Sequence, residues 1–474
     1  MEIRLNNIGI VRDSTIKLDG LTVITGDNNS GKTTVGKALY SLLDAVTDIR
    51  LKNQRDRITF IKRILRRTRD SIDILRFISP AIRRKVFQDY PAMEAFLFMR
   101  FYGNDYDGMD YENFTKDLYK DLKKIKTNDF FAELFSKSRY VDSDELESIK
   151  ELSRLQIDDA ISRFDKLFAE LNKDETLFNY TRDCIDQTLQ VEFSNQIQPI
   201  RKKVDESHIQ IYNENISYFD IGIKENRIEK NENKYFSSNP FENVFFIDDP
   251  FVLDGTISDN RNMEYVEDYD SFIDDSRFNS HNKKLRAYLN RIDNISFLEK
   301  TAIEERYTSI IEKINAILPG SFVFSEKGDF YIDKGKKLRV SNLATGSKMI
   351  SILKILLGKG ALNDKTMLIL DEPEAHLHPS WQNLFAEMIA ILVKELKVTV
   401  LLTTHSSNFM LALDAFMRKY ELYEVSHFYQ TKKTKSGFVD YECVDDNMDV
   451  IYQDFLKYFS EMKYLRSEYC KNDN

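Results

Sequence analysis

The segment that most constrains this chain is "GDNNSGKTT", residues 26–34, which stands between the apolar run "LTVIT" and the helix-like run "VGKALYSLLDAV". Its spacing is glycine, four residues, glycine, lysine and threonine, which is typical of a phosphate-binding loop between a strand and a helix. Glycines let successive backbone N–H groups turn inward around phosphate oxygens. The sequence therefore predicts an α/β fold around a nucleotide site.

Within this loop, the lysine and the threonine after it have distinct expected roles. Lys32 supplies a positive charge to the outer phosphates, and Thr33 offers a hydroxyl to Mg²⁺. The predicted nucleotide-binding residues are Gly26, Asp27, Asn28, Asn29, Ser30, Gly31, Lys32, Thr33 and Thr34. The alternative is a chance match on a glycine-containing turn between a strand and a helix.

A second motif, "MLILDEPEAHLHP", spans residues 367–379. Its apolar residues predict a buried strand that presents Asp371 to the Mg²⁺ ion. Glu372 follows at the strand tip, where a carboxylate polarises an attacking water as a general base. The alternative is a strand end with two solvated acids.

Two further motifs flank this strand. "NLATGSKMISILKILL" predicts a helix that starts at Gly346, and we expect Thr345, Gly346 and Ser347 to form an anion site facing the γ-phosphate of a partner copy. "VTVLLTTH" predicts a strand ending at His405, whose imidazole can hydrogen-bond the γ-phosphate. The alternatives are an ordinary capped helix start and a passive polar histidine.

The distance between the motifs predicts the domain organisation. Lys32 and Asp371 are 339 residues apart, so a large segment is inserted into the nucleotide-binding core. We expect residues 1–45 and 201–474 to form that core and residues 46–200 to form a helical insertion, because the latter are charged, aromatic-rich and helically spaced. The polar, acidic stretch at 255–285 predicts a loop.

Composition excludes some classes of protein. A net charge of −9 argues against a uniformly basic nucleic-acid binder. The three cysteines are widely spaced, which argues against a disulfide framework or a zinc site. Because the N-terminus carries no apolar signal segment and no apolar run approaches a membrane span, we expect a soluble, cytoplasmic protein.

Positive charge is nevertheless concentrated between Arg50 and Lys85, where thirteen Lys and Arg residues stand against three Asp. The segment "RITFIKRILRRTRDSIDILRFI" also has helically spaced apolar residues, which predicts one buried and one cationic face. Nucleic-acid phosphates are the natural partner of such a face. A solvated face, or a contact with an acidic segment at 264–275, explains the pattern equally well.

Taken together, the four motifs resemble the ATPase heads of the ABC superclass that includes RecF, SMC and the OLD family. The stretch from "NLATGSKMISILKILL" through "MLILDEPEAHLHP" to "VTVLLTTHSS" is most similar to the stand-alone ATPase subunits of anti-phage systems of the Septu type, including those beside retrons. The likeness covers about the first 45 residues and those after about 330.

The resemblance implies an ABC-type head that binds ATP and Mg²⁺, with catalytic Glu372, switch residue His405 and a homodimer or higher oligomer formed through the nucleotide sites. It also implies a separate HNH nuclease subunit, because the 69 residues after His405 are too few for the nuclease domain of OLD enzymes. The superclass signature Leu-Ser-Gly-Gly is here Leu-Ala-Thr-Gly, and no glutamine loop is evident. "FFIDDPF" is a candidate replacement, with Asp248 or Asp249 near the metal; a structural acidic turn is the alternative.

The leading hypothesis is therefore an ATP-hydrolysing subunit of a prokaryotic defence complex that regulates a partner nuclease. A RecF-like DNA repair ATPase is one alternative, with the basic segment on DNA. A scaffold that binds nucleotide without significant turnover is another.

Overall fold

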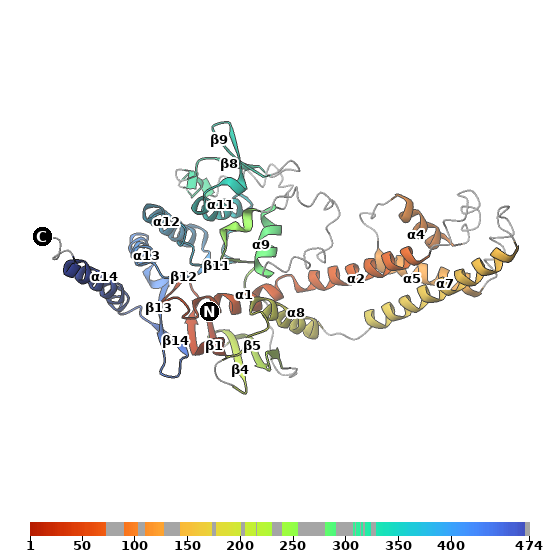
Figure 1. Ribbon diagram of the computed structural model, residues 1–474, viewed down its shortest axis with the longest axis horizontal. Coiled ribbons are helices and arrows are strands. Elements are labelled where there is room, and N and C mark those ends of the chain that lie inside the picture. The colour runs from red at the N-terminus through yellow and green to blue at the C-terminus, as the bar shows by residue number, and fades with distance from the viewer. Residues whose placement is uncertain are drawn as a thin grey trace. The chain divides into compact units, whose positions relative to one another are not determined.

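The computed structural model divides the chain into two compact units (Figure 1). The head comprises Met1–Thr47 and Phe178–Asn474, and the helical unit comprises Asp48–Leu177. The structure describes residues 1–72, 90–102, 110–127, 143–172, 177–200, 204–214, 216–229, 239–254, 280–290, 307–308, 310–312, 314–315, 318–323 and 329–469.

The head is built on an eleven-stranded sheet within these residues. In sheet order its strands are β6 (Arg227–Ile228), β5 (Ile216–Lys224), β4 (Ser207–Asn213), β1 (Glu2–Ile8), β2 (Val11–Lys17), β14 (Val439–Cys443), β13 (Ser426–Lys433), β3 (Leu21–Thr25), β12 (Thr399–Thr404), β11 (Thr366–Asp371) and β7 (Asn243–Ile247). The five strands from β13 to β7 are parallel, so the segments that follow them meet at one edge. The motifs lie at this edge.

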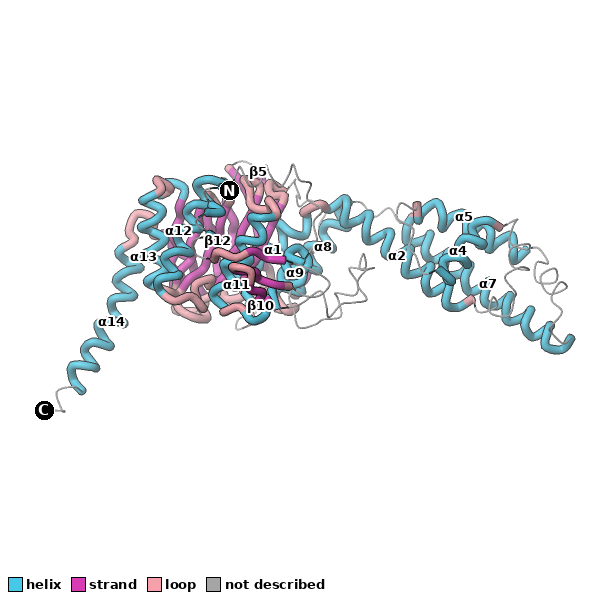
Figure 2. The backbone as a smooth tube through the Cα atoms, turned by 90° about the horizontal axis from the view of Figure 1, so that it is seen from above, coloured by secondary structure: helices cyan, strands magenta, loops and turns pink. Residues whose placement is uncertain are grey.

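Helices cover both faces of the parallel strands, and Figure 2 shows the strands between them. Helix α1 (Lys32–Val46) packs with Met367 and Ile369 of β11 in one hydrophobic core. On the other face, α11 (Thr345–Gly358), α12 (Pro379–Leu396) and α13 (Ser407–Lys419) pack with Leu368 and Leu370. Because side chains alternate along a strand, one apolar strand contributes to both cores.

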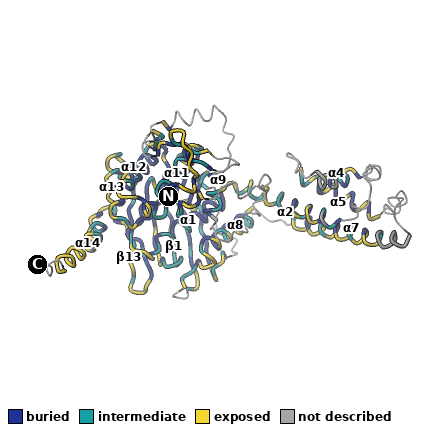
Figure 3. The backbone as a smooth tube through the Cα atoms, turned by 45° about the horizontal axis from the view of Figure 1, so that its top comes forward, coloured by how far each residue is buried: buried dark blue, intermediate teal, exposed yellow. Residues whose placement is uncertain are grey.

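The remaining elements of the head are shorter or peripheral. A small antiparallel sheet consists of β8 (Ser321–Val323), β9 (Phe330–Asp333) and β10 (Lys336–Arg339). The other helices are α8 (Leu177–Glu192), α9 (Ser280–Asn290), α14 (Asp449–Tyr469) and the 3-10 turns η2 (Pro250–Asp254), η6 (Val340–Asn342) and η7 (Tyr423–Val425). Figure 3 shows α14 as mostly exposed, in contrast to the parallel strands β3, β11 and β12 of the large sheet, which are almost wholly buried.

The helical unit has a hydrophobic core of its own. It consists of α2 (Ile49–Ser71), α4 (Pro91–Tyr102), α5 (Tyr111–Thr127) and α7 (Ser143–Leu171). Ile61 of α2, Leu118 and Leu122 of α5 and Phe164 of α7 are all fully buried in this core.

Two predicted boundaries differ from the structure. The insertion was expected to span 46–200, but the helical unit is Asp48–Leu177, and Ile185 and Leu189 of α8 pack in the head. The loop expected at 255–285 lies outside the described residues up to 279, and from Ser280 the chain is helical in α9. Helical periodicity predicts a helix but not the core against which it packs.

Within the described residues, no helix is both long and apolar enough to cross a membrane. In the predicted basic segment, α2 has the expected amphipathic character: Ile61 and Leu65 are buried, whereas Arg63 and Arg66 are exposed. The segment's last four cations, Arg76, Arg83, Arg84 and Lys85, lie outside the described residues.

Candidate functional site

The glycine-bracketed loop connects β3 to α1, and its two glycines are required by geometry. Gly31, directly before α1, has φ 78°, a left-handed conformation that favours glycine. At Gly26 an added Cβ would lie 1.8 Å from Thr431 Oγ1 of β13. The loop is therefore held against the C-terminal strands, and larger residues do not fit at either end.

Lys32 lies at the centre of this loop and is almost fully buried. Its Nζ donates to the carbonyl oxygens of Gly26 at 3.0 Å and Asp27 at 2.9 Å, and lies 3.3 Å from Glu372 Oε1. The ammonium group is therefore held between the loop and the tip of β11.

The other loop residues differ in exposure. Ser30 is 2 % exposed, and its buried hydroxyl has no hydrogen-bond partner among the described residues. Asp27, Asn28 and Asn29 are exposed, and Thr34 is half-buried. An orphaned hydroxyl inside a loop of this shape fits a site that takes phosphate oxygens.

Thr33 and Asp371, the predicted Mg²⁺ ligands, lie in direct contact. Thr33 Oγ1 donates to Asp371 Oδ2 at 2.7 Å, and Thr403 of β12 donates to Asp371 Oδ1. Burial raises the pKa of Asp371, the two threonines lower it, and the charges of Glu372 and Asp248 raise it, so that the net direction is upward. A cation bound beside Asp371 would favour its ionised form and so offset burial and the neighbouring negative charges.

Glu372 has a left-handed backbone, with φ 48°, which is unusual for a residue other than glycine. Its N–H donates to both the carbonyl and the hydroxyl oxygen of Thr403, at 3.1 Å each. Its carboxylate contacts two basic side chains: Oε1 lies near Lys32 Nζ, and Oε2 lies 3.2 Å from His405 Nδ1. Such backbone conformations concentrate at functional sites.

His405 follows the tip of β12, and its side chain is 42 % exposed. It lies between Glu372 and Glu374, whose Oε1 is 4.0 Å from His405 Nδ1. Glu374 is buried and accepts from the hydroxyl of Thr404 at 2.5 Å. Burial raises the pKa of Glu374, and this outweighs the effect of the hydrogen bonds that lower it.

The predicted anion site lies apart from these contacts. Thr345, Gly346 and Ser347 form the first turn of α11, and Ala344 before them provides no side-chain cap. Gly346 packs against the segment after β11, where an added Cβ would lie 3.0 Å from the carbonyl oxygen of His376. No hydrogen bond or ion pair between described residues joins this turn to the loop at 26–34.

Sequence reasoning missed several supporting residues. Tyr441 of β14 is buried, and its hydroxyl donates to the carbonyl oxygen of Gly31 at 2.6 Å. Thr403 and Glu374 hold Asp371, Glu372 and His405 in place. The polar "TTH" at the end of an apolar strand was an available signal for Thr403; Tyr441, 410 residues from its partner, had none.

The donor set fits ATP with Mg²⁺. Mg²⁺ is usually held by one or two carboxylates and completed by phosphate oxygens and water. Thr33 and Asp371, whose oxygens lie 2.7 Å apart, supply one hydroxyl and one carboxylate of such a set.

The parallel sheet, the loop between β3 and α1 and the acidic tip of β11 define an ATPase head of the ABC type. In agreement, the profile of the AAA ATPase domain family matches residues 1–410, and the chain belongs to this family. A search of curated protein sequences returned no match.

Several solved structures are similar to this chain. An SMC head domain from Thermotoga maritima has 11 % identity and a TM-score of 0.35, with 94 % of this chain and 98 % of that one covered. An SMC head bound to the C-terminal winged-helix domain of ScpA has 11 % identity and a TM-score of 0.39, with 93 % and 96 % covered. A Pyrococcus furiosus SMC head with an extended coiled coil, bound to the C-terminal domain of ScpA, has 10 % identity and a TM-score of 0.31, with 98 % of each chain covered.

Proposed function

We propose that this protein binds ATP with Mg²⁺ and hydrolyses it to ADP and phosphate. The observation that carries the proposal is the continuous set of contacts from Thr33 to Asp371 and from Lys32 through Glu372 to His405. Mg²⁺, when bound, would add positive charge at the phosphates.

In this proposal each residue has one task. Lys32 leaves the loop carbonyls to neutralise the outer phosphates, and Thr33 and Asp371 hold the cation. Glu372 orients the attacking water and accepts its proton, and His405 donates a hydrogen bond to the γ-phosphate. The contact between Glu372 and His405 keeps both side chains at the same end of the site.

The active unit is proposed to be a dimer in which each nucleotide lies between two heads. The first turn of α11 supports this arrangement, because its N–H groups have no side-chain cap and no contact to the chain's own phosphate loop among the described residues. Thr345, Gly346 and Ser347 would then contact the γ-phosphate held by a partner copy.

The biological role that we propose is ATP-dependent control of a separate HNH nuclease in anti-phage defence. The similarity of the motif-bearing segments to Septu-type ATPase subunits supports this role. Purification of the native complex from its own operon, followed by native mass spectrometry, tests it. We expect at least two copies of this chain together with a smaller nuclease subunit; a complex without any nuclease would contradict the role.

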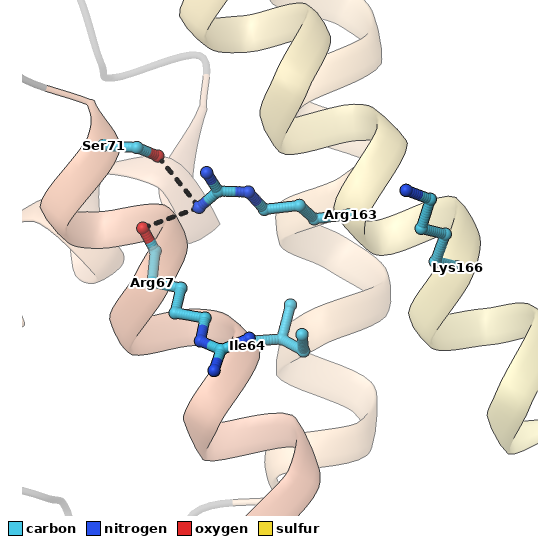
Figure 4. Close-up of a pocket in the computed structure, with 5 residues that line it drawn as sticks. All are labelled: Ile64, Arg67, Ser71, Arg163 and Lys166. Carbon is cyan, nitrogen blue, oxygen red and sulfur yellow. Dashed lines mark hydrogen bonds between the residues drawn. The ribbon is translucent and has the colours of Figure 1, made fainter.

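A DNA repair ATPase is the second candidate, and a basic hollow in the helical unit favours it. The hollow has a volume of about 600 Å³ and is lined by Ile64, Arg67, Ser71, Arg163 and Lys166. Figure 4 shows Arg163 extending from α7 to α2, where it donates to the carbonyl oxygen of Arg67 at 2.8 Å and to Ser71 Oγ at 3.3 Å. Two helices thus present cations around one concave surface, which suits a phosphate backbone.

We expect the double variant Arg67→Glu/Lys166→Glu to bind duplex DNA more weakly. The slope of log Kd against the logarithm of the salt concentration should fall by about two, one for each lost phosphate contact. These substitutions leave the hydrogen bond between α7 and α2 in place, because its donor is the Arg163 side chain and its acceptor is the backbone carbonyl oxygen of Arg67. Fluorescence anisotropy at several salt concentrations measures both quantities. The matched control is Lys116→Glu/Lys124→Glu on the exposed face of α5. Equal loss in both double variants would contradict a specific role of the hollow.

A further inference from the structure

One acidic residue beside the ATPase site has no role in the proposal above. Asp248 follows β7, the strand that pairs with β11 with Ile247 opposite Leu370. This register places Asp248 next to Asp371 at the edge where the motifs meet. The two carboxylates also interact electrostatically: the charge of Asp248 is one of the causes that raise the pKa of Asp371.

Two residues at the start of α9 contact the carboxylate of Asp248. His281 Nε2 lies 3.0 Å from Asp248 Oδ1, and Asn282 Nδ2 donates to the same oxygen at 3.0 Å. Both contacts use Oδ1, so neither engages Oδ2. The Asp248 side chain is 22 % exposed, whereas that of His281 is completely buried.

His281 is in turn held by a second buried acid. Its Nδ1 lies 2.6 Å from Glu192 Oε2, and its backbone N–H donates to Glu192 Oε1 at 3.0 Å. Glu192 is the last residue of α8 and is also completely buried. The Phe246 ring stacks on the imidazole with a centroid distance of 4.3 Å, so the orientation of the ring is fixed.

The charges of this cluster support an ionised Asp248. Burial lowers the pKa of His281, but Asp248 and Glu192 raise it more, to about 9, so the imidazole is a cation at neutral pH. Burial raises the pKa of Asp248, but His281 and Asn282 lower it more, so the net direction is downward. The His281 cation therefore lies between two carboxylates, those of Glu192 and Asp248, and of these three side chains only that of Asp248 is partly exposed.

Stability alone gives little reason to keep such a cluster. Buried ion pairs are often no more stabilising than well-packed apolar side chains of the same volume, since desolvation offsets the attraction. A buried ion pair does, however, fix the orientation of the side chains that form it. Asp249 shows the contrast: its Oδ1 accepts from the N–H of Phe251 at 2.8 Å, which is an ordinary capped turn at η2.

We propose that Asp248 holds a water of the Mg²⁺ ion beside Asp371, and that the buried pair of His281 and Glu192 positions its carboxylate for this contact. The inference rests on the proposed ATPase function. It assigns the acidic pair after β7 to separate roles, Asp248 to the cation and Asp249 to the turn. His281 and Glu192 act only through Asp248.

The first test measures how strongly nucleotide binding depends on Mg²⁺. For Asp248→Asn, the Mg²⁺ concentration that gives half-maximal binding of a fluorescent ATP analogue should rise about tenfold, as is typical when a residue supporting a metal's ligands is removed. Binding measured in EDTA should not change. The matched control is Asp249→Asn, which retains the acceptor for Phe251 and should leave the Mg²⁺ requirement unchanged.

A second test distinguishes positioning from general structural support. Glu192→Gln/His281→Leu removes the two fully buried charges together, so that neither is left without its partner, while the part-exposed Asp248 keeps its hydrogen bond from Asn282. This double variant should raise the Mg²⁺ requirement in the same direction. Adding Asp248→Asn to this pair should raise it no further, because residues that act through one another are not additive. His281→Gln, which keeps an N–H donor, should recover part of the wild-type behaviour.

The outcomes separate this inference from the ATPase proposal. If the wild-type protein binds the analogue with Mg²⁺ while Asp248→Asn has an unchanged Mg²⁺ requirement, the inference is wrong and the ATPase proposal stands. Additive effects of the Glu192/His281 pair and Asp248→Asn would refute positioning. If the wild-type protein binds no nucleotide, both fail. Circular dichroism checks that each variant is folded. If the variants at the buried residues Glu192 and His281 unfold, Asp248→Asn still decides the question, because the Asp248 side chain is partly exposed.

Discussion

Glu372→Gln should reduce steady-state ATP hydrolysis by about a hundredfold or more, the usual range for loss of a general base. Glutamine has the same shape, and its carbonyl oxygen can take the position of Oε1, 3.3 Å from Lys32 Nζ. It cannot take a proton from water. ATP binding should therefore persist, and the nucleotide-bound dimer should accumulate because the step that ends that state is blocked. Phosphate release and size-exclusion chromatography with ATP measure the two effects.

The control for this variant is Glu395→Gln on α12, which removes the same charge from an exposed position outside the site. It should hydrolyse ATP at the wild-type rate. If Glu372→Gln also retained full turnover, Glu372 would not be the base. If the wild-type protein itself trapped ATP without releasing phosphate, the protein would be a nucleotide-binding scaffold.

Local sequence patterns predicted several residues that the structure brings together at the candidate site, because each motif combines a secondary-structure signal with a chemical one. An apolar run ending in Asp371 indicates a buried strand with a carboxylate at its tip, and β11 has this form. The spacing of Gly26, Gly31 and Lys32 requires a turn into a helix, and the structure has this turn. Such motifs are self-contained, so they can be interpreted without knowing what packs around them.

The supporting contacts could not be predicted in the same way, because they join residues that are distant in sequence. His281 and Glu192 are 89 residues apart, and His281 lies in a polar stretch with few apolar residues to mark a helix. Burial of the imidazole depends on Phe246 and Tyr40 from two other elements. For α8, the helical pattern was visible, but only the tertiary structure shows that Ile185 and Leu189 pack in the head.

Lys32→Ala should weaken ATP binding by about 10- to 100-fold, since hydrogen bonds to charged groups contribute about 1.5–3 kcal/mol. The ammonium group is the one cation that the structure holds inside the phosphate loop among the described residues, with its Nζ on two loop carbonyls and near Glu372. Titration calorimetry in a Glu372→Gln background measures affinity without interference from turnover.

The matched control is Lys37→Ala, which removes a half-buried lysine further along the same helix, outside the loop. Lys32→Arg adds a second comparison: a planar guanidinium is not equivalent to a compact ammonium, so its affinity should stay well below wild type. Both substitutions keep the glycines and the backbone of the loop intact. If Lys32→Ala bound ATP as tightly as Lys37→Ala, the phosphates would have to lie elsewhere, and the contacts of Lys32 with Gly26 and Asp27 would be structural.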